Sequence, residues 1–160
     1  MHGQVLLFSS ILAMVVAQLY KVIAYRWYHK EWKWSRFLVT GGMPSSHTAL
    51  MCTLTTSCLF FYGWSSPWFA VSFVSSIVVI YDAIGVRRQA GEHALILHEL
   101  IAQLHEAGVD IKPHVFRRFR HWQRQGHTPA EVVGGVLLGV VIALVSHIVL
   151  CLQAKGAMIF

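Results

Sequence analysis

Long runs of apolar residues constrain this chain more than any other feature of its sequence. The runs extend from Val5 to about Ala24, from His47 to Tyr62, from Trp68 to Tyr81, and from Val132 to Leu152. A helix of about 20 apolar residues crosses the hydrocarbon core of a bilayer, which is ~30 Å thick. The two middle runs are shorter, and they could span if each gained a turn, or if the bilayer thinned locally. We therefore expect membrane helices over about 4–24, 46–62, 67–84 and 129–152.

The composition is that of an integral membrane protein rather than a soluble domain. Of the 160 residues, 56% are hydrophobic and only 12% are charged, and soluble domains usually carry about twice that share of charge. The net charge of +6 could indicate nucleic-acid binding, but the basic residues flank the apolar runs and form no solvated arm. We expect an all-α helical bundle in one membrane domain over 1–160, with membrane lipids and not nucleic acid as partners.

The positive charges gather in two loops, and this asymmetry predicts the orientation of the chain. Residues 26–43 and 85–125 hold nearly all of them: Arg26, Lys30, Lys33, Arg36, Arg87, Arg88, Lys112, Arg117, Arg118, Arg120 and Arg124. Loops on the cytoplasmic side of a membrane carry an excess of Lys and Arg. Both loops should therefore face the cytoplasm or its organellar equivalent, and both termini should lie on the opposite side.

Within the second loop, residues 91–107 have helical spacing. Ala94, Leu97, Ile101 and Leu104 form an apolar stripe, and Glu92, Glu99 and Glu106 recur on another face. This pattern predicts an amphipathic helix that lies on the membrane or packs on the bundle. Three histidines of this segment, His93, His98 and His105, are better explained as surface residues than as metal ligands.

Two helix starts carry the residues best suited to chemistry. In G-H-T-P-A-E at 126–131, Thr128 is a good N-cap, Pro129 suits the first helical position, and Glu131 completes a capping box. His127 then stands at the positive end of a helix, where exposed N–H groups favour an anion. A parallel arrangement at 41–48, G-G-M-P-S-S-H-T, places His47 at the start of another apolar run. Two such starts facing each other would form a phosphate site.

The expected topology brings further polar residues to the same membrane face. Lys21 lies near the end of the first helix, and the third helix ends near Asp82, Arg87 and Arg88. Ionisable groups at membrane depth are costly, so they indicate function by default. Asp82 is better explained by an ion pair with Arg87 or Arg88 than by a Mg²⁺ site, because one carboxylate is poor support for a metal.

These residue types suit the transfer of a phosphoryl group. A phosphomonoester needs cations and N–H donors around its oxygens, an in-line nucleophile, and an acid for the leaving alkoxide. A neutral histidine can attack phosphorus while a carboxylate fixes its tautomer, and a second histidine can protonate the leaving group. We expect the phosphate to be bound by Lys21, Arg87, Arg88 and Thr128.

The motifs resemble those of a known superfamily. P-S-S-H at 44–47 and G-H-T-P-A-E at 126–131 are similar to the second and third signatures of the type 2 phosphatidic acid phosphatases and vanadium-dependent haloperoxidases. With Y-D-A-I-G-V-R-R-Q-A-G at 81–91, they resemble its small, divergent membrane branch over roughly 15–145. The resemblance implies His127 as the nucleophile, Glu131 as its orienting acid and His47 as the general acid. It also implies that Ser45, Ser46 and nearby backbone amides bind the phosphate. It implies no metal or other cofactor, although vanadate could occupy the site as a phosphate mimic.

The sequence lacks two basic residues of the superfamily pattern. Tyr28 stands seven residues after Lys21, where the first signature has Arg, and His121 stands six residues before His127, where the third has Arg. Arg87 or Arg88 could supply the missing guanidinium.

The leading hypothesis is a membrane-embedded hydrolase of lipid phosphate monoesters, or of prenyl phosphates or diphosphates, through a phosphohistidine. The alternative is a non-catalytic membrane scaffold or anionic-lipid-binding protein that retains the phosphate site. Transport is disfavoured, because only Gln18 and His147 are polar deep in the first and last apolar runs. Gly135 and Gly139 form a G-x-x-x-G motif, which permits close helix packing within a monomer more often than in a homodimer.

Overall fold

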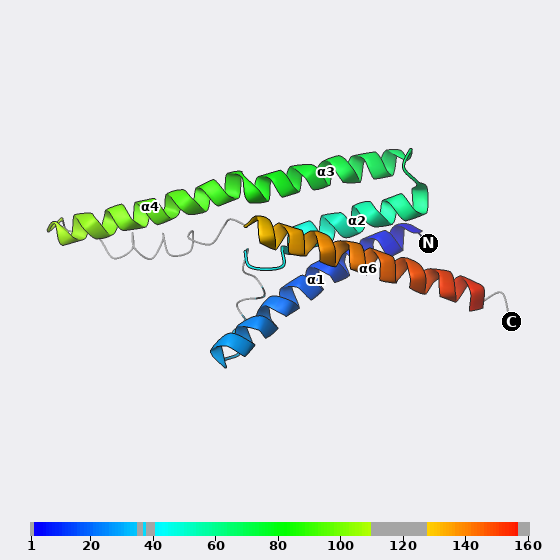
Figure 1. Cartoon of the computed structure of the whole chain (residues 1–160), viewed down its shortest axis with the longest axis horizontal. Coiled ribbons are helices and arrows are strands. Elements are labelled where there is room, and N and C mark those ends of the chain that lie inside the picture. The colour runs from blue at the N-terminus through cyan, green and yellow to red at the C-terminus, as the bar shows by residue number, and fades with distance from the viewer. Residues whose placement is uncertain (1, 35–36, 38–40, 110–127, 157–160) are drawn as a thin grey trace.

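A computed structural model describes residues 2–34, 37, 41–109 and 128–156, and in these ranges all regular structure is helical. The helices are α1 (His2–His29), α2 (Ser46–Tyr62), α3 (Pro67–Ile84), α4 (Val86–Glu106) and α6 (Pro129–Gly156), as Figure 1 shows. Three helical stretches are long and apolar enough to cross a membrane: Gly3–His29, Pro67–Glu106 and Pro129–Ala154. The expected all-α membrane bundle is confirmed.

Local capping explains where α2 and α3 begin and end. Ser45 caps α2, because its hydroxyl oxygen accepts a 3.4 Å hydrogen bond from the Thr48 N–H. The helix ends at Tyr62, and the next residue, Gly63, has a φ of 78°, which is left-handed and therefore favours glycine. Ser66 caps α3 by accepting from the Trp68 N–H, and Pro67 occupies the first helical position. Both helices have the bounds expected from the sequence.

The other two long helices continue beyond their apolar runs. α1 extends to His29 rather than to about residue 24, and the next residue, Lys30, has a left-handed φ of 55°. α6 extends to Gly156 rather than to 152. The segment from Tyr25 to His29 contains neither Gly nor Pro, so nothing in it interrupts a helix where hydropathy falls.

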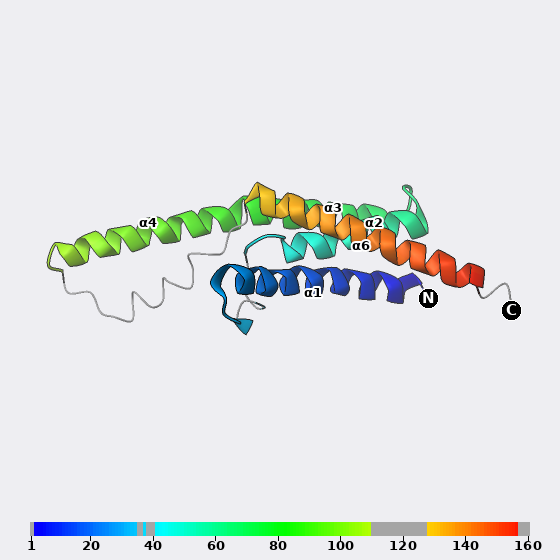
Figure 2. The same ribbon diagram turned by 60° about the horizontal axis from the view of Figure 1, so that its bottom comes forward.

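α2 is the central helix of the bundle. It contacts α1, α3 and α6, and α1 also contacts α6 (Figure 2). The core between them consists of small residues, since Ala13, Ala17 and Ala49 are fully buried. Large apolar side chains point outward instead, and Val71 and Leu137 are 66% and 63% exposed. This inversion is what a bilayer favours, because lipid solvates large side chains and small ones allow helices to approach closely.

The G-x-x-x-G motif of α6 packs against α2 of the same chain. A Cβ added to Gly135 would lie 2.6 Å from the Ser45 carbonyl oxygen, and one on Gly139 would lie 2.6 Å from that of Ala49. Thr53 Oγ1 also donates to the Gly139 carbonyl oxygen at 3.0 Å. The two glycines therefore bring helices together within the monomer. A homodimer stays a prediction, and it would need another surface.

Hydroxyl groups join α2 to α3. Thr55 Oγ1 and Ser76 Oγ are 2.7 Å apart, and Ser76 Oγ lies 3.2 Å from the Met51 carbonyl oxygen. Such bonds between helices satisfy polar groups that lipid cannot solvate. They fix α3 against the side of α2.

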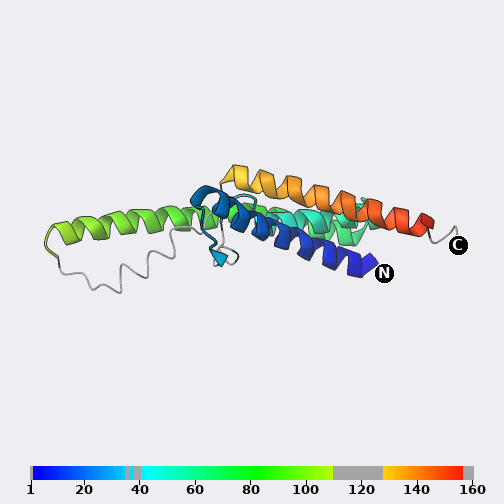
Figure 3. The same ribbon diagram turned by 90° about the horizontal axis from the view of Figure 1, so that it is seen from below.

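α4 differs from the expected amphipathic helix in its start and its direction. Only Gly85 separates it from α3, and α4 continues away from the bundle in nearly the direction of α3 (Figures 1 and 3). Among the helices described, α4 contacts only α3. Of the two expected placements, packing on the bundle is thus not seen among the described helices beyond the contact with α3, and a position on the membrane surface stays a prediction. A lone glycine costs a helix only about 1 kcal/mol, so Gly85 does not force the chain to turn onto the membrane surface.

Different segments of the chain lie at the two ends of the bundle. The start of α1 and the end of α6 lie at one end, together with the turn between α2 and α3 (Figures 1 and 2). The starts of α2 and α6 lie at the other end, near the junction of α3 and α4. Which end faces the cytoplasm stays a prediction.

Candidate active site

The starts of α2 and α6 are in direct contact. The Ser45 N–H donates to the backbone carbonyl oxygen of Glu131 at 2.9 Å. A Cβ added to Gly134 would lie 3.1 Å from Met43 Cε and 3.5 Å from Pro44 Cβ. The segments that carry P-S-S-H and G-H-T-P-A-E therefore lie side by side, although they are distant in sequence.

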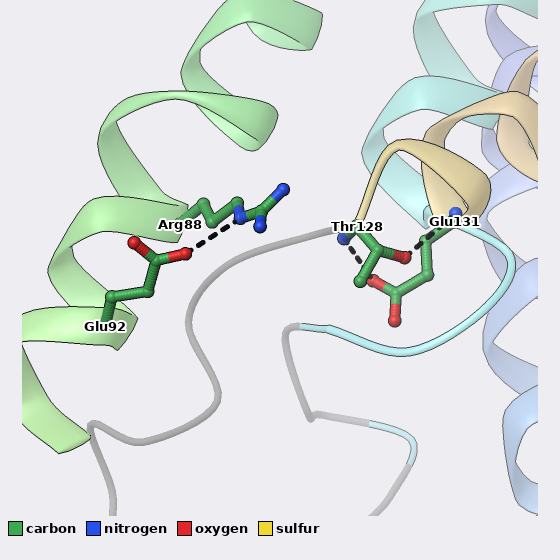
Figure 4. Close-up of polar contacts among 4 residues, drawn as sticks. All are labelled: Arg88, Glu92, Thr128 and Glu131. Carbon is green, nitrogen blue, oxygen red and sulfur yellow. Dashed lines mark hydrogen bonds and ion pairs between the residues drawn. The ribbon is translucent and has the colours of Figure 1, made fainter.

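A capping box begins α6, as the sequence predicts. The Thr128 N–H donates to Glu131 Oε2 at 3.3 Å, and the Glu131 N–H donates to Thr128 Oγ1 at 3.3 Å (Figure 4). This pair fixes the Glu131 carboxylate at the helix start. His127 directly precedes Thr128 but lies outside the described residues, so its role as the nucleophile stays a prediction.

The start of α2 is buried against its neighbours. Ser45, Ser46 and Thr48 are buried, and His47 between them is half-buried. Thr48 Oγ1 donates to Ser45 Oγ at 2.9 Å. The Ser45 hydroxyl therefore accepts both from this side chain and from the Thr48 N–H, and these two bonds fix its position. The first N–H groups of a helix have no partner within it and carry its positive partial charge. The Ser45 and Thr48 N–H groups already donate to protein acceptors, so an anion here would meet the positive partial charge of the helix and the N–H groups between these two.

Lys21 of α1 reaches these helix starts. Its side chain is only 9% exposed, and a Cβ added to Gly42 would lie 4.0 Å from Lys21 Cδ. The loop that contains Gly42 leads into Ser45, whose N–H is bonded to the Glu131 carbonyl oxygen, so Lys21 lies close to the start of both helices. Lys21 Nζ is buried, and it has no hydrogen-bond partner within the described part of the chain. Burying a charge without hydrogen bonds is costly, so the ammonium favours an anionic ligand beside it.

Gln18 is a buried polar residue near Lys21 that the motifs do not reveal. Its Oε1 atom is buried, and residues 2–34, 37, 41–109 and 128–156 give it no hydrogen-bond partner. Gln18 precedes Lys21 by three residues, which places both on one face of α1. The three-residue spacing from Lys21 was the only sign of this in the sequence, where Gln18 was considered only as a polar residue deep in the first apolar run.

Arg87 and Arg88, the cations of α4 predicted to bind phosphate, differ from Lys21 in what is described around them. Arg88 Nε donates to Glu92 Oε1 at 3.0 Å, in a pair that is about half exposed (Figure 4). The side chain of Arg87 is outside the description, and Asp82 is half-buried in the last turn of α3. The described contact of Arg88 thus lies within α4. Phosphate binding by Arg87 and Arg88 stays a prediction.

The residues described do not gather into a metal site. No group of three or more His, Cys, Asp and Glu side chains in these ranges could hold an ion. His93, His98 and His105 lie at intervals along α4. The described donors at the helix starts are instead an ammonium, hydroxyls and backbone N–H groups, which suit a phosphate.

Comparison with known proteins gives the family. Residues 2–142 match the family described as the divergent PAP2 family, PAP2 being the type 2 phosphatidic acid phosphatases. The chain is also 35% identical over 144 residues to a Bacillus subtilis (strain 168) protein named uncharacterized membrane protein YuiD. That alignment covers 87% of this chain and 91% of the relative. No solved structure matches. The resemblance seen in the motifs is confirmed, and the chain belongs to the divergent PAP2 family of membrane proteins.

Proposed function

We propose that this protein is a membrane-embedded phosphatase of lipid phosphates, with its site at the starts of α2 and α6. Its substrates are phosphate monoesters of lipids, or prenyl phosphates or diphosphates. The basic loops face the cytoplasm or its organellar equivalent, so the site opens at that face of the membrane. The proposal requires no metal, and vanadate should compete with substrate as a phosphate mimic.

The observation that carries the proposal is the buried ammonium of Lys21, which has no hydrogen-bond partner among the described residues. Segments of three elements lie around it. Lys21 of α1 is beside Gly42 in the loop before α2, and this loop is bonded to the start of α6 through the Ser45 N–H and the Glu131 carbonyl oxygen. A phosphate beside Lys21 would satisfy the ammonium and would also meet the N–H groups at the start of α2. Within residues 2–34, 37, 41–109 and 128–156, a structural role alone leaves this charge without a hydrogen bond.

The reaction follows from these groups and from the family motifs. A ring nitrogen of His127 attacks phosphorus, the bond from phosphorus to the ester oxygen breaks, and His47 gives its proton to the leaving alkoxide. Glu131 accepts the other ring N–H of His127 and so fixes its tautomer. Water then attacks the phosphohistidine, His47 takes its proton, and inorganic phosphate leaves. Lys21 and the N–H groups of α2 stabilise the charge on the phosphoryl oxygens.

Phosphate release tests this proposal. Purified protein in mixed micelles receives phosphatidate, phosphatidylglycerophosphate or farnesyl diphosphate, beside the variants His127→Ala and His47→Ala. We expect release by the wild type and a loss of at least ~100-fold in either variant, since general acid catalysis alone contributes about 10²–10⁴-fold. Circular dichroism and thermal unfolding verify that the variants are folded. Release that is equal in wild type and variants, or absent with every lipid, would favour the non-catalytic lipid-binding scaffold.

A further inference from the structure

An apolar groove runs along α2 between α1 and α3. Both of these helices pack on α2, but within the described residues they do not pack on each other. The groove between them has a volume of about 440 Å³. Its floor is formed by Met51, Leu54 and Cys58 of α2, and its walls include Leu6 of α1 and Trp68 and Val71 of α3.

The floor of this groove lies on the same face of α2 as His47. The positions 47, 51, 54 and 58 are spaced by four, three and four residues, and residues at this spacing share one face of a helix. The groove therefore begins about one turn from His47. It continues along α2 to Tyr62, which lies eleven positions after Met51, a distance of about 16 Å at ~1.5 Å per residue.

We propose that the groove binds the apolar chain of the phosphate ester while its phosphate occupies the site at Lys21. This inference rests on the proposed function. The chain of a lipid phosphate is attached to the oxygen that leaves, and His47 protonates that oxygen. The chain must therefore depart from the site on the side of His47, where the groove begins. Its length selects a single acyl or prenyl chain lying along the helices.

Narrowing the groove tests this assignment through chain length. Ser75 lines the groove and is half-buried, whereas its neighbour Val74 is 59% exposed and does not line it. Ser75→Trp should lower kcat/KM for hexadecyl phosphate at least about tenfold, since two fewer buried methylenes weaken binding by about that factor. Hydrolysis of phenyl phosphate, which has no chain, should change less than twofold. Val74→Trp is the matched control and should leave both substrates unchanged.

A second variant avoids the packed part of the groove. Gly3 lines its far end, and a Cβ there would meet no atom within 4 Å. Gly3→Phe should therefore fold normally and impair hexadecyl phosphate more than octyl phosphate, whose chain is too short to reach it. Equal effects on both chain lengths, or no effect of either groove variant, would overturn the proposal while leaving the phosphatase assignment in place.

Photolabelling shows where the alkyl chain binds, and it does not depend on catalytic turnover. The wild type in phosphatidylcholine nanodiscs receives hexadecyl phosphate with a diazirine on its terminal carbon. We expect labelling of peptides that contain Gly3, Leu6 or Trp68, and competition by unlabelled hexadecyl phosphate but not by hexadecanol. Labelling on lipid-facing residues such as Leu137, or competition by hexadecanol alone, would contradict a substrate groove. Crosslinking of the groove to a second copy of this chain would assign it to a dimer instead.

Discussion

The contact between α2 and α6 is tightly packed, whereas α4, which we call the arm, extends away from the bundle. At the contact, Gly135 and Gly139 let two backbones approach until an added Cβ would lie 2.6 Å from a carbonyl oxygen. α4 has no comparable contact, because among the described helices it touches only α3, while Leu95 and Leu97 are exposed. The proposed site lies in the first region, since Ser45 and Glu131 are joined there. A phosphate site needs donors in fixed positions, and the tight packing of these two helices holds their starts in place.

The largest effect should come from a methyl group at that contact. In Gly135→Ala the new Cβ would meet the Ser45 carbonyl oxygen at 2.6 Å and Thr48 Cβ at 2.9 Å, neither of which can move freely. We expect a loss of about 2 kcal/mol in the free energy of unfolding, measured by denaturant titration in detergent, and loss of phosphate release. Gly134→Ala is the control, because its nearest neighbour is the flexible end of Met43 at 3.1 Å. Equal stability of the two variants would contradict the packing described here.

The next effect should be on anion binding, without a loss of stability. Lys21→Met removes a buried ammonium that lacks a described hydrogen bond, so the unliganded protein should be as stable as the wild type or more stable. Affinity for orthovanadate should fall at least about tenfold, because a hydrogen bond to a charged group contributes about 1.5–3 kcal/mol. Titration with vanadate, followed by thermal unfolding, measures both quantities. The exposed Lys30, as Lys30→Met, provides the comparison. Undiminished vanadate affinity would remove Lys21 from the site.

A smaller effect is expected at the cap of α6. Thr128→Ala removes the acceptor of the Glu131 N–H and should cost about 1 kcal/mol. Thr128→Ser keeps a hydroxyl there and should cost much less. Hydrogen exchange of the Glu131 amide reads the change directly. If the two variants exchange at equal rates, the capping box does not hold this helix start.

The smallest effects should lie on the arm. The pair between Arg88 and Glu92 is about half exposed, and exposed pairs at this spacing contribute about 0.3–0.5 kcal/mol. Glu92→Gln should therefore shift stability by no more than that, with phosphate release within twofold of wild type. Arg88→Gln should weaken vanadate binding less than Lys21→Met does. A larger loss in Arg88→Gln would place the arm in the site and would erase the contrast between the two regions.

The bounds of α2 and α3 were predictable because their ends carry local signals. Ser45, Ser66, Pro67 and Gly63 begin or end helices through their own side chains or backbone angles. The contact between the two motif segments also followed from the chain order, since both precede long apolar helices. Family membership followed from the motifs themselves.

Neither the direction of α4 nor the burial of the polar side chains of Lys21 and Gln18 in α1 was predictable in this way. Periodicity shows that residues 91–107 have an apolar stripe, but not whether another helix covers it. The burial of Lys21 and Gln18 without described hydrogen bonds depends on how three helices converge. No local pattern encodes that convergence, so Arg88 and Lys21 looked alike in the sequence, although the structure gives them different surroundings.

Trapping of the covalent intermediate tests the central claim most directly. Wild-type protein, Lys21→Met and Glu92→Gln would each be mixed with phosphatidate labelled at its phosphate and quenched in alkali, where phosphohistidine survives. We expect label on a peptide that contains His127 in the wild type and in Glu92→Gln, and at least about tenfold less in Lys21→Met. Absence of label from His127, or equal labelling in Lys21→Met, would contradict a phosphatase site formed by α1, α2 and α6.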